Sequence, residues 1–276
     1  MNANGPRYKH KGLRSRAQPE SLNLIFAALG GVVLLFIVAP LVGMFLHSTG
    51  ELVETATDVE VQRSIWLTLW TSMTATLILA IAAVPFSYLL ARRNFPFKRL
   101  ITAIIDLPIV IPHSAAGIAI LGVISREGLI GRAGELFGVR FISTPAGIMV
   151  AMAYVSLPFL INSARNGFEA VPERLEKVAL SLGRSPVRVF FTISLPLAFR
   201  AVLSGLILMW ARGMSEFGAV VIVAYHPMIT PIMIYERFGA FGLKYARPIS
   251  ALFVSVCLVL FIVLRLVVRE KKNVEC

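Results

Sequence analysis

EAVPERLEKVALSLGRSPVRVFFTISLP, from Glu169 to Pro196, is a polar stretch between two long apolar runs, too polar to span a bilayer and too long for a simple connection. Its apolar residues follow the i, i+3, i+4, i+7 spacing of an amphipathic helix: Leu175, Val178, Ala179 and Leu182. Gly183 suits the left-handed turn that ends such a helix. Ser185–Pro186 is typical of the N-cap and first position of a second helix. The stretch therefore predicts two short helices joined by a glycine turn. Pro172 is expected at the first position of the first helix, and Pro196 at the start of the next span.

The rest of the chain is unusually apolar. Of 276 residues, 57% are hydrophobic and 15% are charged, whereas a soluble domain carries about 25% charged residues. This apolar content excludes a disordered chain, and two cysteines are too few for a disulfide scaffold. The composition predicts a polytopic membrane protein.

Six apolar runs are long enough to cross a bilayer as helices. They are residues 22–46, 65–90, 100–124, 145–163, 201–225 and 248–268. The third run is interrupted by Pro108 and Pro112. No run shows the two-residue alternation of a membrane strand. The expected fold is therefore an all-α polytopic membrane bundle of six transmembrane helices. A basic tail at 1–21 precedes a single transmembrane domain at 22–276.

The distribution of lysine and arginine predicts the orientation. With the N-terminus in the cytoplasm, nineteen of the 27 basic residues fall inside, seven fall outside, and Arg212 lies within the fifth run. This asymmetry follows the positive-inside rule. The net charge of +12 is thus a signal of topology, not of nucleic-acid binding. Both termini and the Glu169–Pro196 stretch are expected in the cytoplasm.

Ionisable residues inside the runs are functional candidates, because burying them in a membrane is costly. Arg212 and Glu216 stand at i and i+4 on the fifth run and are expected to pair. The pair either locks helix packing or lines a pathway and rearranges. The other pathway candidates lie in the third run: Asp106, Pro108, Pro112 and His113. His113 is either a packed histidine or a ligand.

The chain lacks the common catalytic motifs. It has no P-loop, no H-E-x-x-H zinc motif and no G-x-S-x-G nucleophile motif. We therefore predict no catalytic residue and no metal site. A secondary transporter remains a competing hypothesis on these grounds, since broken helices and buried charges suit one.

The polar stretch resembles the EAA loop of binding-protein-dependent ABC importer permeases. Lys177-Val178-Ala179, Gly183 and the Ile193–Pro196 end match its spacing, although the family prefers Glu and Ala at positions 177 and 178, and Glu176 sits one place early. The resemblance implies a permease domain whose coupling loop, about residues 167–196, inserts into an ATP-hydrolysing subunit. The residues implied to couple are Glu176, Lys177, Val178, Ala179, Gly183, Arg184, Ser185 and Pro186.

Two further stretches resemble signatures of molybdate, tungstate and sulfate permeases. They are Asp106–His113 (DLPIVIPH) and Trp210–Ala219 (WARGMSEFGA), and Tyr235–Phe238 resembles the archaeal-type molybdate/tungstate members. The alternatives are a sulfate/thiosulfate permease and an ion-coupled secondary transporter.

The resemblance also implies an assembly in the cell membrane of a prokaryote. A second copy of this chain would complete the pore in the lipid bilayer, and two ATPase subunits would bind ATP and magnesium. An extracellular binding protein would deliver the oxyanion. The chain itself is expected to hold no cofactor.

Overall fold

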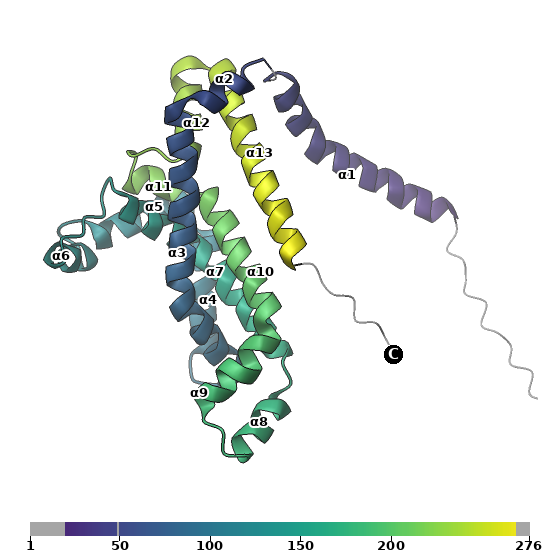
Figure 1. The fold of residues 1–276 in the computed structure, drawn as a ribbon, viewed down its shortest axis with the longest axis vertical. Coiled ribbons are helices and arrows are strands. Elements are labelled where there is room, and N and C mark those ends of the chain that lie inside the picture. Colours follow the sequence, from purple (N-terminus) through teal and green to yellow (C-terminus); the bar gives the residue numbers. More distant parts are fainter. Residues whose placement is uncertain (1–19, 49, 269–276) are drawn as a thin grey trace, which may run out of the picture. The chain divides into compact units, whose positions relative to one another are not determined.

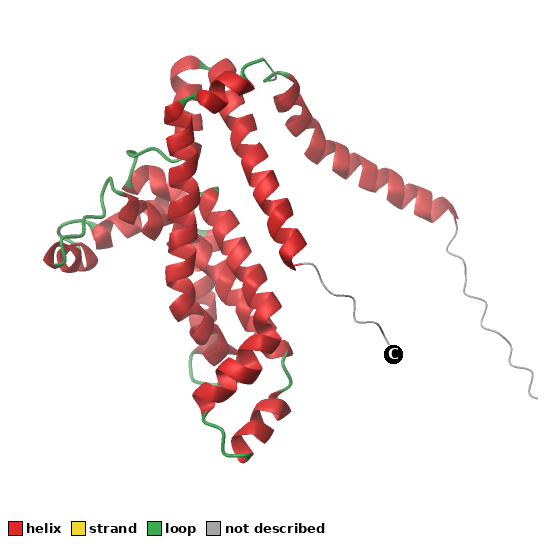
Figure 2. Cartoon of the chain, in the orientation of Figure 1, coloured by secondary structure: helices red, strands yellow, loops and turns green. Residues whose placement is uncertain are grey.

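We describe a computed structural model covering residues 20–48 and 50–268. Within these residues every regular element is a helix (Figure 2). Most of the predicted basic tail, residues 1–19, lies outside the described part. The chain divides into two units, residues 1–47 and 48–276, which we describe separately. The first unit contains α1 (Glu20–Leu46), which coincides with the first predicted run.

Four long helices build the second unit (Figure 1). They are α3 (Val59–Arg92), α7 (Pro145–Ala170), α10 (Leu195–Met214) and α13 (Leu243–Val268). Helix α7 packs along both α3 and α10 and buries Met152, Leu160 and Phe168. At 1.5 Å per residue a helix of 26 residues extends about 39 Å, enough to cross a hydrocarbon core of about 30 Å. Among the described residues, five helices including α1 are apolar and long enough to span a membrane, or six if one bent pair of shorter helices counts as a single span.

The third predicted run is broken at Pro112, as the sequence predicts, but it is not broken at Pro108. It forms α4 (Lys98–Val110) and α5 (His113–Ile124), bent by 114° at the break between them. Ile111 is extended because it precedes a proline, and Pro112 has no N–H to continue the helix. Pro108, in contrast, lies inside α4 without ending it.

The fifth predicted run also needs correction. The helical segment begins earlier, at Pro186, and passes through α9 (Pro186–Val189), a π-helical turn η1 (Phe190–Ser194) and α10. Pro196 lies in the first turn of α10, as predicted, but inside this continuous segment. It ends at Met214, before Glu216, and a separate α11 (Gly218–Val223) follows. The carboxylate of Glu216 accepts a hydrogen bond from the backbone N–H of Ala219, which favours this restart.

The second unit has two distinct ends. At one end, α2 (Leu52–Thr57), the start of α3 and α12 (Thr230–Phe241) lie together, joined by Arg237–Glu60 and by Thr68 with Thr230 (Figure 1). At the other end lies α8 (Glu173–Ser181), beside the end of α3. Helix α6 (Leu129–Leu136) follows α5. We call these two ends the α12 end and the α8 end.

Candidate functional site

The 167–196 segment forms the predicted helix, turn and second helix. Pro172 is the N-cap of α8 rather than its first residue. Gly183 has φ +82°, the left-handed conformation that glycine adopts without strain. Ser185 caps α9 by accepting a hydrogen bond from the Arg188 N–H at 3.4 Å. Figure 1 shows α8 and α9 at the tip of the bundle.

Three of the four residues in the predicted apolar stripe are exposed, whereas the fourth, Ala179, is buried. The side chains of Leu175, Val178 and Leu182 are 41%, 57% and 78% exposed, and Val187 on α9 is also exposed. Within α8 only Glu176 and Ala179 are buried. A cluster of exposed apolar side chains at the tip of the bundle is typical of a protein interaction surface.

The outer polar residues of α8 are solvated. Lys177 pairs with Glu173 at 2.8 Å, and both side chains are exposed. The hydrogen bond and charge of Lys177 hold the pKa of the Glu173 carboxyl below its ordinary value. Arg184 is exposed in the turn.

Glu176 lies on the inner side of α8, within what we call the Glu176 cluster. Arg92 on α3 holds this carboxylate as a fork, with Nε at 3.0 Å and Nη2 at 2.7 Å from Oε1. Ser194 of η1 donates to Oε1 at 2.8 Å, and Tyr88 donates to Oε2 at 3.1 Å. Both partners of the ion pair are largely buried. The resemblance implies that Glu176 couples to an ATPase subunit. In the structure its side chain instead contacts α3 and η1 of the same chain.

A second buried carboxylate, Glu216, lies between the break in α4–α5 and the end of α10. Its Oε2 is 3.0 Å from Arg212 Nη2 and 3.0 Å from His113 Nδ1. Arg212 Nη2 also lies within hydrogen-bond distance of the His113 ring nitrogens. We call these three residues the Glu216 cluster. The predicted Arg212–Glu216 pair is confirmed, and His113 packs against it.

Helices α5 and α11 pack closely beside the Glu216 cluster. A Cβ on Gly117 of α5 would lie 2.9 Å from the Ala219 carbonyl oxygen, and one on Gly218 would lie 2.7 Å from the His113 Cβ. Only glycine permits α5 and α11 to approach this closely.

Asp106 stands apart from both clusters. Its Oδ1 accepts a hydrogen bond of 2.6 Å from Asn162 Nδ2, which joins α4 to α7. The prolines predicted for the pathway have backbone roles: Pro108 is buried within α4, and Pro112 caps α5.

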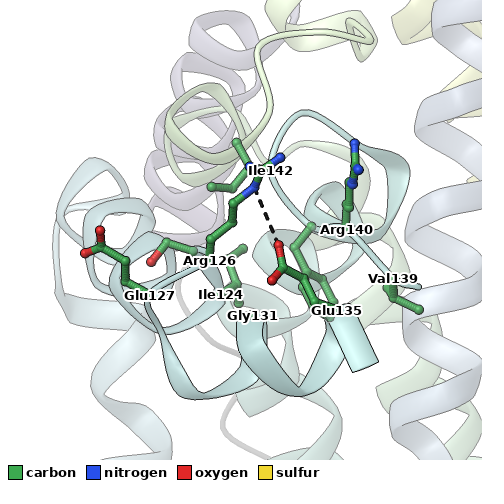
Figure 3. A pocket seen from close by; sticks show the side chains of 10 residues that line it. Ile124, Arg126, Glu127, Gly131, Glu135, Val139, Arg140 and Ile142 are labelled. Carbon is green, nitrogen blue, oxygen red and sulfur yellow. Dashed lines mark ion pairs between the residues drawn. The ribbon is translucent and has the colours of Figure 1, made fainter. Parts of the chain in front are cut away.

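An open cavity of about 460 Å³ lies between the end of α5, α6 and the following loop (Figure 3). Arg126 and Glu135, 3.5 Å apart, face each other across it, and Arg140 also lines it. None of the predicted pathway residues lines this cavity.

Residues 83–272 match the family described as binding-protein-dependent transport system inner membrane component. The chain belongs to this family. It is therefore a multi-pass membrane protein of a transport system, and the 167–196 segment lies within the matched residues.

Several relatives of this chain are named as permease proteins for oxyanions. The chain is 41% identical to the molybdate/tungstate transport system permease protein of Pyrococcus abyssi, over 90% of this chain and 96% of that protein. It is 42% identical to its counterpart in Methanocaldococcus jannaschii, over 87% and 94%. A probable sulfate transport system permease protein of Chlorokybus atmophyticus is 35% identical, over 70% and 69%.

Solved ABC transporters share the fold of this family member. A bacterial alginate importer matches with a TM-score of 0.70 at 15% identity, covering 92% of this chain and 98% of that one. An inward-facing methionine transporter, MetNI, matches with a TM-score of 0.60 at 16% identity, covering 76% and 94%.

Sequence reasoning missed the side chains that join α8 to α3 and η1, and the side chain that joins α7 to α4. Arg92 was counted only as a topological charge, and Tyr88, Ser194 and Asn162 were not singled out. One signal was present: Glu176 precedes the buried Ala179 by three residues, so the two share a helix face.

Proposed function

We propose that this chain is the permease subunit of a binding-protein-dependent ABC importer for molybdate or tungstate. Family membership and the 41% identity to the Pyrococcus abyssi permease support the substrate class. The observation that carries the mechanism is the exposed apolar face of α8, formed by Leu175, Val178 and Leu182. A separate ATPase subunit would cover this face.

In this proposal the α8 end lies in the cytoplasm with both termini, and the α12 end faces an extracellular oxyanion-binding protein. Two copies of the chain form the pore in the cell membrane of a prokaryote. ATP and magnesium bind to two partner ATPase subunits, and this chain performs no covalent chemistry. Closure of the ATPases moves both α8 helices and turns the pathway outward, and hydrolysis resets it.

The position of basic residues supports this orientation. Arg92 lies beside Glu176 at the α8 end, so the basic segments 92–99 and 165–200 share one end of the unit. The positive-inside rule assigns that end to the cytoplasm. Selectivity would reside mainly in the binding protein, because a deep anion trap in the pore would slow release.

The test is uptake into proteoliposomes that contain this chain, its cognate ATPase and its oxyanion-binding protein. We expect molybdate or tungstate uptake that requires ATP and all three components. Uptake by this chain alone, driven by a proton or sodium gradient, would establish a secondary transporter instead. Sulfate taken up in preference to molybdate would favour the sulfate permease, to which the Chlorokybus relative points.

A further inference from the structure

Helix α8 rests on the bundle through very few side chains. Of its nine residues only Glu176 and Ala179 are buried. Two short segments connect it to the rest of the chain. The extended residues Val171 and Pro172 precede it, and the Gly183 turn follows it. A Cβ on Gly183 would meet no atom within 4 Å, and the residues of this turn are exposed. A displacement of α8 therefore reaches the bundle through its flanking segments, the small Ala179 side chain or the buried carboxylate.

That carboxylate joins α8 to two other elements and, through Arg92, to the end of α7. Its four donor groups come from α3 and η1, and Arg92 Nη2 also donates to the Val171 carbonyl oxygen at 2.8 Å, at the end of α7. A planar guanidinium that meets a carboxylate through two N–H groups fixes orientation as well as distance. Because both side chains are largely buried, salt screens the pair weakly.

Helix α3 extends from this contact to the opposite end of the unit. It begins at Val59 beside α12, where the Thr230 N–H donates to Thr68 Oγ1 at 2.9 Å and Arg237 pairs with Glu60 at 2.6 Å. It ends at Arg92. A single continuous helix thus connects the Glu176 cluster with the α12 end.

From these contacts we propose that the Arg92–Glu176 pair is a positioning contact that transmits the movement of α8 to α3 and α7. This inference rests on the proposed function, in which an ATPase moves α8. Glu176 then acts inside the permease and not on the ATPase surface. Movement of α8 can reach the bundle in more than one way. One is the continuous chain through α9 and α10, and another is the ion pair between Glu176 and Arg92.

The experiment measures molybdate uptake per ATP hydrolysed in the reconstituted complex, with each value normalised to the amount of assembled complex. The variants are Glu176→Gln, which keeps the shape and removes the charge, and Arg92→Lys, which keeps the charge and removes the fork. Glu173→Gln is the matched control, because Glu173 pairs with a basic residue on the exposed side of the same helix.

We expect ATP hydrolysis to continue in Glu176→Gln and Arg92→Lys while uptake per ATP falls about tenfold, the factor that corresponds to loss of one charge-assisted hydrogen bond. Glu173→Gln is expected to stay within about twofold of the wild type, because exposed ion pairs contribute little. Tyr88→Phe removes one hydrogen bond and leaves the ion pair, so a smaller loss in uptake per ATP is expected.

The outcomes separate this inference from the proposed function. If the wild-type complex itself shows no ATP-dependent uptake, the proposed function fails. If the wild type transports and the variants keep its uptake per ATP, the pair transmits nothing and this inference is wrong. The variants could instead lower only the amount of assembled complex, with uptake per ATP unchanged in them and in Tyr88→Phe. That result would show a purely structural role for the pair and would also overturn this inference.

Discussion

Two buried glutamates, Glu176 at the α8 end and Glu216 at the helix break, each pair with an arginine but are held differently. Both Glu176 oxygens accept aligned hydrogen bonds from side chains of α3 or η1. Glu216 Oε1 accepts from Ala219 N–H, but no donor among the described residues is aligned with its Oε2. Arg212 and His113 lie 3.0 Å from that atom without such alignment.

This difference indicates different mechanical roles. A fully satisfied buried carboxylate resists rearrangement, because breaking any contact leaves a buried polar group unpaired. A carboxylate with one loosely held oxygen loses less when its neighbours move. We therefore expect the Glu176 cluster to move as one body and the Glu216 cluster, beside the 114° bend, to change its contacts.

The largest expected effect is that of Arg212→Ala. This change strands Glu216, which is 0% exposed. Breaking a buried ion pair costs about 3–5 kcal/mol, and the lower value applies because the Arg212 side chain is itself 22% exposed. The measurement is the temperature at which half of the detergent-solubilised protein remains monodisperse. The double variant Arg212→Ala/Glu216→Ala should be milder, and a double variant no better than the single one would refute the pairing.

Gly183→Val, at the α8 end, is expected to have an intermediate effect. A side chain has open space there, so the cost is the left-handed backbone alone, about 1–2 kcal/mol. Gly183→Asn is the matched control, since asparagine tolerates this conformation. Stimulation of ATP hydrolysis by the oxyanion-loaded binding protein should fall in the valine variant and largely persist in the asparagine variant. Equal stimulation in both would contradict the importance of this turn.

Ser185→Ala is expected to have the smallest effect. Its hydroxyl caps α9 through a long hydrogen bond of 3.4 Å, so the loss should be about 0.5–1 kcal/mol. Hydrogen exchange at the α9 amides should accelerate a few-fold, about the factor that this free energy gives. Amides of α11, next to Glu216, should not change. Faster exchange at both ends would mean that the two regions are not independent.

The sequence predicted the α8 end well because its signals are local. The Gly183 turn and the Ser185–Pro186 start of α9 depend on backbone preferences that single residues express. The apolar runs were predictable for the same reason, since bilayer thickness sets their length. The stripe on α8 was visible too, but whether it faces the bundle or solvent depends on what packs against the helix.

The break and the buried contacts depend on tertiary structure. Both Pro108 and Pro112 disfavour a helix, yet only the second coincides with a bend, and α5 beyond that bend packs against α11. The burial of Arg92 depends on a glutamate 84 positions later. No local pattern predicts such a contact.

The central claim is that the apolar face of α8 contacts an ATPase in the cytoplasm. The direct test places Leu182→Cys in a Cys257→Ala/Cys276→Ser background, with Val53→Cys on α2 as the exposed control at the α12 end. An impermeant thiol reagent should label position 53 but not 182 in right-side-out vesicles. In inverted vesicles it should label position 182, and bound ATPase subunits should block that labelling. Labelling of position 182 from outside the cell, or labelling that the ATPase does not reduce, would contradict the account.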